Sequence, residues 1–108
     1  MTPLYIASED GHLEVTKFLM ASGASINKST YDRGWTPLFM ASKNGHLEVV
    51  KILIASGGSV NKATKKGATP LHIAGQDGHL EVVKFLIASG GSINQADSDG
   101  TTSLYIAS

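Results

Sequence analysis

The chain has 108 residues, in which nine lysines and arginines balance nine aspartates and glutamates, and it has no cysteine. The lack of cysteine excludes disulfides and thiolate metal sites and favours an intracellular location, cytoplasmic or, as the alternative, nuclear. No apolar run approaches the roughly 20 residues of a membrane span, and no basic stretch followed by an apolar run indicates a signal peptide, so we expect neither.

The first predicted element is a short helix signalled by the phrase at Thr2–Ser8. Its Thr-Pro start favours a helix, because the hydroxyl can accept a backbone N–H and proline fits the first helical position. The same phrase returns at residues 36–42, 69–75 and 102–108. Each return predicts another short first helix, and the last of them has no partner helix within the sequence.

The second predicted element is a longer helix that follows the phrase Gly-His-Leu-Glu-Val at residues 11–15, 45–49 and 78–82. The glycine ends the first helix, because it tolerates the left-handed conformation at a helix C-terminus. The second helix is apolar nearly all round, which predicts that neighbours sandwich it. A Glu–Lys pair three residues apart recurs as Glu14/Lys17, Glu48/Lys51 and Glu81/Lys84 and is worth about 0.2–0.5 kcal/mol each time.

The third predicted element is a polar, glycine-containing loop that extends and turns back on itself. An asparagine recurs at its start, as Asn27, Asn61 and Asn94, and we expect it to hold the loop by side-chain to backbone hydrogen bonds. The stretch Lys28–Trp35 is one residue longer than its counterparts. The Thr-Pro-Leu and Gly-His-Leu-Glu-Val phrases repeat at the same spacing. This repetition predicts an all-α solenoid of antiparallel helix pairs with projecting, β-hairpin-like loops.

These phrases and their spacing closely resemble the ankyrin repeat family over essentially the whole chain. We expect repeats at 1–30, 31–63 and 64–96, a partial fourth at 97–108, and a chain that is a slice of a longer array with neighbouring repeats. The resemblance implies non-catalytic units that bind proteins through hairpin tips and the concave face of the first helices. The chain departs from the family pattern where Tyr5, Phe39 and Tyr105 replace its histidine and Ser103 replaces its proline.

Histidines recur as His12, His46 and His79, but units roughly 8–10 Å apart cannot bring them to one metal ion. We therefore expect them to start helices and to make hydrogen bonds between repeats. No nucleophile elbow and no phosphate-cradling glycine pattern is present, so the sequence predicts no enzyme and no cofactor.

Function is best sought where the repeats differ. Trp35 is the only tryptophan and stands where the other repeats have Ala68 and Thr101, so it either binds a partner or packs against a neighbouring loop. Residues 28–66 carry seven cations against two anions, a net charge of +5 between two acidic ends. This band is either a solvated surface or a docking site for an acidic segment; its few cations, hardly interleaved with aromatic residues, argue against nucleic acid.

We predict a protein–protein interaction module that binds a partner protein or peptide, without membrane insertion. The alternative is a stiff scaffold or spacer in a larger multidomain protein. The predicted binding residues are those that differ between repeats at loop and first-helix positions: Asp32, Arg33, Trp35, Lys43, Asn44, Lys65, Lys66, Gln76, Asp77, Ser98 and Asp99.

Overall fold

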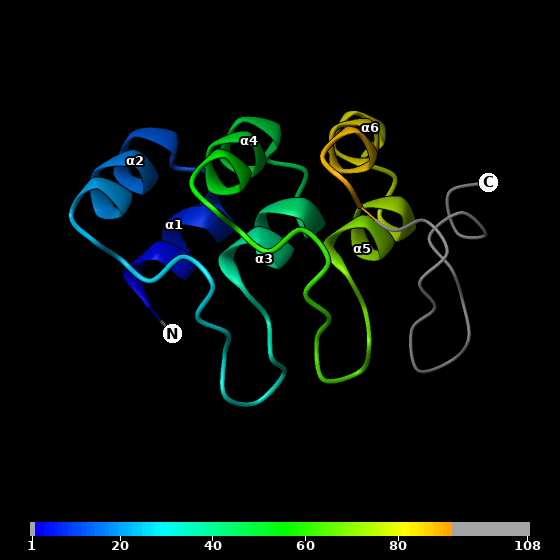
Figure 1. Ribbon diagram of the computed structural model, residues 1–108, viewed down its shortest axis with the longest axis horizontal. Helices are drawn as coiled ribbons and strands as arrows, with labels where there is room; N and C mark the ends of the chain where they lie inside the picture. Colours follow the sequence, from blue (N-terminus) through cyan, green and yellow to red (C-terminus); the bar gives the residue numbers. More distant parts are fainter. Residues whose placement is uncertain (1, 92–108) are drawn as a thin grey trace.

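The computed structural model describes residues 2–91, which form three helix pairs side by side (Figure 1). The pairs are α1 with α2, α3 with α4, and α5 with α6; within residues 2–91 there is no strand. The helices span Pro3–Asp10 (α1), Leu13–Ala21 (α2), Pro37–Lys43 (α3), Leu47–Ala55 (α4), Pro70–Gln76 (α5) and Leu80–Ala88 (α6). The predicted all-α helix-pair solenoid is confirmed. The helix expected at 102–108 and the loop at Asn94 lie outside the described residues.

Each first helix begins as the Thr-Pro phrase predicts. Thr2, Thr36 and Thr69 lie in extended conformation, and each hydroxyl accepts the backbone N–H of the residue three positions on. The donors are Tyr5, Phe39 and His72, at 3.1, 3.1 and 3.2 Å. All three of these side chains are buried. The departure from histidine at this position therefore leaves the helix start intact.

The turn inside each pair needs glycine for its backbone conformation, and in the first two pairs the turn also needs glycine for space. Gly11, Gly45 and Gly78 have φ values of 72°, 73° and 78°, the left-handed region that other residues rarely adopt. A β-carbon on Gly11 would also lie 2.6 Å from the His46 ring, and one on Gly45 would lie 2.5 Å from the His79 ring. Glycine here both turns the chain and admits the histidine of the next pair.

The recurring histidines and asparagines join one pair to the next. Nε2 of His46 lies 2.9 Å from the carbonyl oxygen of Glu9, and Nε2 of His79 lies 2.8 Å from that of Lys43. The Asn27 amide donates to the carbonyl of Gly57, while its side-chain oxygen accepts the backbone N–H of Ser59 at 2.8 Å. The expected histidine bonds between repeats are confirmed for His46 and His79. Asn27 holds the loop of the next pair.

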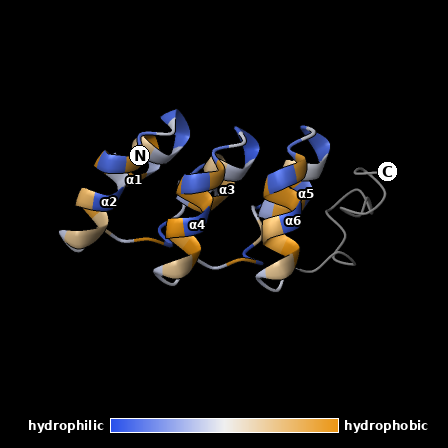
Figure 2. Ribbon diagram, turned by 90° about the horizontal axis from the view of Figure 1, so that it is seen from above, coloured by the Kyte–Doolittle hydropathy of each residue, from blue (hydrophilic) through white to orange (hydrophobic). Residues whose placement is uncertain are grey.

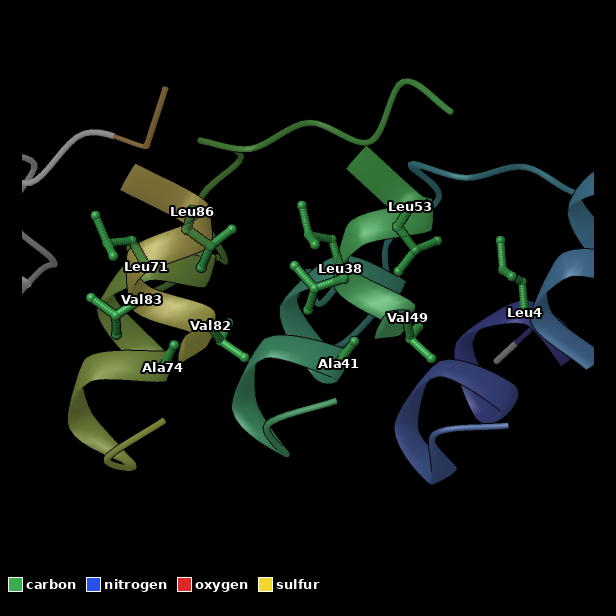
Figure 3. Close-up of a cluster of buried hydrophobic side chains, with 11 residues drawn as sticks. Leu4, Leu38, Ala41, Val49, Leu53, Leu71, Ala74, Val82, Val83 and Leu86 are labelled. Atoms are coloured by element: carbon green, nitrogen blue, oxygen red, sulfur yellow. The ribbon is translucent and has the colours of Figure 1, made fainter. Parts of the chain in front are cut away.

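The core runs through all three pairs as one cluster of buried side chains (Figure 3). Its members come from both helix layers and include Leu4, Leu38, Leu53, Leu71 and Leu86. The second helices are less enclosed than the sequence indicates, because α4 and α6 each bury only three side chains and expose the Glu–Lys face. Figure 2 shows the hydrophobic segments along the helix bodies and hydrophilic residues at the turns that join the helices of each pair.

Candidate protein-binding face

The loops project from the first-helix side of the stack, so that loops and first helices meet at an angle (Figure 1). We call the surface inside this angle the concave face. It consists of the loops at residues 28–35 and 62–68 and the adjoining sides of α1, α3 and α5. Each loop closes on a threonine. The backbone N–H of Thr30 donates to the carbonyl of Trp35 at 2.9 Å, and that of Thr64 donates to the carbonyl of Ala68 at 2.8 Å. The first closure spans one residue more, as the longer loop predicts.

Trp35 is held between a cation and another ring. The Arg33 guanidinium lies 4.8 Å from the centre of the indole, and the Phe39 ring centre lies 5.2 Å from it in a tilted arrangement. The backbone N–H of Trp35 also donates to the Thr30 hydroxyl. Trp35 is nevertheless only partly buried. It therefore packs locally while keeping part of its surface on the concave face.

Lys65 joins the two loops. Its backbone N–H donates to the carbonyl of Arg33 at 3.0 Å, its ammonium group donates to the carbonyl of Tyr31, and that group lies 5.1 Å from the Tyr31 ring centre. The neighbouring Lys66 is exposed and makes no ion pair with any residue in 2–91. Of these two lysines, Lys66 is the one whose charge is available to a partner.

Asp32 introduces a negative charge beside these cations. The backbone N–H of Arg33 donates to its carboxylate at 2.8 Å, and this bond holds the Asp32 pKa below its ordinary value. A hydrogen bond to the ionised form favours that form, so Asp32 remains a carboxylate at neutral pH. The loop at 28–35 thus presents one fixed anion next to one stacked cation.

Three other predicted residues are engaged within the protein. The Lys43 ammonium and the Asp77 carboxylate form an ion pair at 3.3 Å between α3 and the end of α5. The Asn44 amide donates to the carbonyl of Glu9 at 2.9 Å, the same oxygen that faces His46. These side chains link adjacent pairs at the turns. Ser98 and Asp99 lie outside the described residues.

A hollow of about 620 Å³ opens on the concave face between the two loops and α3 and α5. It brings together six of the predicted residues: Asp32, Arg33, Trp35, Lys65, Lys66 and Gln76. Sequence reasoning missed the other lining residues, which are Phe39, Thr64, Ala68, His72 and Ile73. Most of these occupy regular positions of the repeat, so comparison between repeats assigned them to packing alone.

A second hollow, of about 500 Å³, lies on the other side of Trp35 and reaches Tyr5, Glu9 and Met40 of the first and second pairs. Arg33 and Asp32 line both hollows with Trp35. Trp35 therefore forms a ridge between two depressions. Burial raises the pKa of Tyr5 above its ordinary value, so this side chain is a neutral hydroxyl at the edge of the second hollow.

Within residues 2–91 no group of three or more histidine, cysteine, aspartate or glutamate side chains is placed to hold a metal ion. In the same part of the chain, no helix has the length and apolar character needed to cross a membrane.

The family model described as "Ankyrin repeats (3 copies)" matches residues 1–64 and again residues 56–108. These matches cover the whole chain, which therefore belongs to the ankyrin repeat family. Ankyrin repeats are generally protein–protein interaction modules and are generally not catalytic. No curated protein matches the chain closely enough to serve as a relative.

Proposed function

We propose that the chain is a non-catalytic module that binds a partner protein or peptide on its concave face. The observation that supports this most directly is the hollow beside Trp35, where loop and first-helix residues converge around a partly exposed aromatic ring. Tryptophan and arginine are the residues most enriched at the energetic centres of interfaces. Here the two are stacked on each other and already ordered.

We further propose that the bound segment is acidic. Arg33, Lys65 and Lys66 line the hollow with Asp32 as the one carboxylate, so a partner meets an excess of positive charge. Opposite charge speeds association and selects the partner, and the effect falls as salt screens it. Nucleic acid fits less well, because only three cations line the hollow and tight phosphate binding relies on many such contacts. An intracellular location, most simply the cytoplasm, belongs to the same proposal.

The test uses peptides selected from a randomised library against the full chain, with Trp35 fluorescence as the readout. We expect the selected peptides to be rich in aspartate and glutamate. Reversing charge at both Lys65 and Lys66 should weaken their binding about tenfold or more, with a larger loss at low salt. Lys66→Glu alone should account for most of the loss, because Lys65 is already bonded to Tyr31.

The matched control is Lys62→Glu, which makes the same charge change at an exposed residue of the same loop outside the hollow. Equal losses in Lys62→Glu and Lys66→Glu would show that overall charge, and no defined site, attracts the peptide. Selection of neutral or basic peptides would reject the acidic partner while leaving concave-face binding open to mapping by Trp35 fluorescence.

A scaffold or spacer is the second candidate, favoured by the near-identity of the repeats and by the bonds that fix each pair to the next. In this reading the units at 1–30, 31–63, 64–96 and 97–108 continue with neighbouring repeats of a longer array, beside other domains. Solution scattering that shows a stiff rod, together with no peptide selected on the concave face, would favour the spacer over the binding module.

A further inference from the structure

The two hollows that flank Trp35 differ in the charges that line them. Asp32 and Arg33 line both, so one anion and one cation are common to the two. The larger hollow, between α3 and α5, adds the ammonium groups of Lys65 and Lys66, and no further carboxylate among the described residues lines it. We call it the basic hollow. Its excess of positive charge attracts the acidic segment proposed above.

The smaller hollow, between α1 and α3, adds the carboxylate of Glu9 to the shared pair. Within residues 2–91 the Glu9 carboxylate makes no ion pair, and Arg33 is the only cation among the described residues that line this hollow. We call it the acidic hollow. Two carboxylates thus accompany one guanidinium here, and that guanidinium is already stacked on Trp35.

The pKa of Tyr5, at the edge of the acidic hollow, reflects this balance of charge. Burial raises that pKa most, the negative charges of Glu9 and then Asp32 raise it further, and Arg33 lowers it by less than either carboxylate raises it. At the Tyr5 hydroxyl the two carboxylates therefore outweigh the guanidinium. A positive charge that enters the acidic hollow is attracted by this excess of negative charge.

Aromatic rings also suit the acidic hollow to a cation. Tyr5, Tyr31 and Trp35 line it, and ring faces attract ammonium and guanidinium groups that lie within about 6 Å of the ring centre. The Lys65 ammonium lies 5.1 Å from the Tyr31 ring centre, but Tyr31 is 95% exposed, so most of its ring remains open to a ligand. Carboxylates and rings together are the groups that hold a basic side chain.

The acidic hollow owes its opening to the spacing of adjacent first helices on the concave face. Its place between α1 and α3 corresponds to that of the basic hollow between α3 and α5 (Figure 1). The basic hollow is open although a loop lies on each side of it, since residues of both the 28–35 and the 62–68 loops line it. A repeat before the first pair would therefore add a loop beside the acidic hollow without filling it.

We propose that the acidic segment bound at the basic hollow also carries one basic residue, arginine or lysine, which enters the acidic hollow. This specificity rests on the binding function proposed above and adds a requirement on the sequence of the partner. Adjacent repeats lie roughly 8–10 Å apart, and an extended segment advances about 3.3 Å per residue. The basic residue therefore lies about two to four positions from the acidic residue that meets Lys66, and Trp35 contacts the residues between them.

The test compares, position by position, the peptides selected from the randomised library against the full chain. We expect an arginine or lysine at a constant distance from an aspartate or glutamate. In one such peptide, replacing the basic residue with glutamine should weaken binding about fivefold, measured by Trp35 fluorescence. Glu9→Gln removes the charge that distinguishes the acidic hollow. With this variant, the same replacement in the peptide should change the affinity by less than about twofold.

Glu14→Gln is the matched control, because it removes the same charge from the first pair at an exposed residue of α2 that lines neither hollow. The basic residue of the peptide should contribute as much to binding Glu14→Gln as to binding the wild type. Glu9→Gln keeps the backbone carbonyl that Asn44 and His46 contact, and circular dichroism should show that it is folded.

Acidic peptides without a basic residue at a constant distance would overturn the requirement for a basic residue and leave the acidic partner intact. The same conclusion would follow if the basic residue contributed equally to binding Glu9→Gln and the wild type. Failure to select any peptide on the concave face would instead reject the binding function itself, and the basic residue with it.

Discussion

At the scale of single residues, the contact between glycine and histidine decides how closely two helix pairs approach. The Gly11 and Gly45 positions leave no room for a methyl group beside His46 and His79, while Gly78 has the same backbone conformation and its β-carbon position meets no atom of residues 2–91 within 4 Å. Gly45 and Gly78 therefore both need the left-handed backbone conformation, but only Gly45 lies against a histidine ring. Their comparison separates backbone strain from steric overlap.

We predict that Gly45→Ala destabilises the protein more than Gly78→Ala does. Both changes place an L-residue in the left-handed region, at a cost of about 1–2 kcal/mol. Gly45→Ala also forces the His79 ring away from the carbonyl of Lys43, which should add roughly 1–3 kcal/mol. Urea denaturation in dilute solution gives both free energies of unfolding. Equal losses would mean that the histidine relaxes without cost.

At the scale of the elements, each first helix is seven or eight residues long, and its stability depends on the threonine that caps its N-terminus. Helices this short are marginal alone, so the threonine cap and the packed neighbours must hold them. The i,i+3 Glu–Lys pairs on the second helices, at 3.4 to 3.6 Å, are largely exposed and contribute little. The caps of α3 and α5, where Thr36 and Thr69 are buried, matter more than the ion pairs.

We predict that Thr69→Ala lowers the free energy of unfolding by about 0.5–2 kcal/mol, because the His72 backbone N–H loses its acceptor. Thr69→Ser keeps the hydroxyl and should recover most of that loss. Glu81→Gln, which removes one exposed ion pair, should change stability by no more than about 0.5 kcal/mol. Thermal unfolding followed by circular dichroism would rank the three variants. A serine variant as unstable as the alanine variant would contradict a hydrogen-bonding role.

The elements themselves were predictable, because the signals for them are local. Thr-Pro and Gly-His fix where the helices begin and end, and the extra residue of the first loop appears as the longer closure at Thr30–Trp35. The candidate site was predictable only in part. Differences between repeats pointed to Trp35 and Arg33, but not to their stacking, since that depends on how the loop turns.

Contacts between residues far apart in the sequence could not be predicted either. The ion pair of Lys43 with Asp77 and the bond of Asn44 to Glu9 arise only when pairs stack. Because Lys43, Asn44 and Asp77 vary between repeats, we predicted that they bind a partner. Each of them instead makes a contact within the protein. The buried Phe39 and His72 were missed because their repeat positions indicate packing.

At the scale of the whole molecule, one core connects all three pairs, and no pair encloses a core of its own. Unfolding of the middle pair should therefore remove support from both neighbours. Leu53 lies in α4 of that pair and is fully buried. The stack should respond to damage there as a single unit.

We predict that Leu53→Ala destabilises the protein by about 2–5 kcal/mol and keeps one cooperative transition. Circular dichroism, which reports on all helices, and Trp35 fluorescence, which reports on the first long loop, should give the same midpoint in urea. The exposed Leu80→Ala is the control and should shift the midpoint far less. Separate midpoints for the two signals in Leu53→Ala would show that the pairs unfold independently.

The backbone bond from Lys65 to Arg33, described above as a link between two loops, has a consequence for affinity. It fixes two exposed segments against each other before any partner arrives, and the Lys65 side chain adds a second tie through Tyr31. Ordering a loose loop on association would cost about 0.5–1.5 kcal/mol for each immobilised side chain. In this protein that ordering is completed when the chain folds, so the surface around Trp35 is preorganised for the partner that we propose.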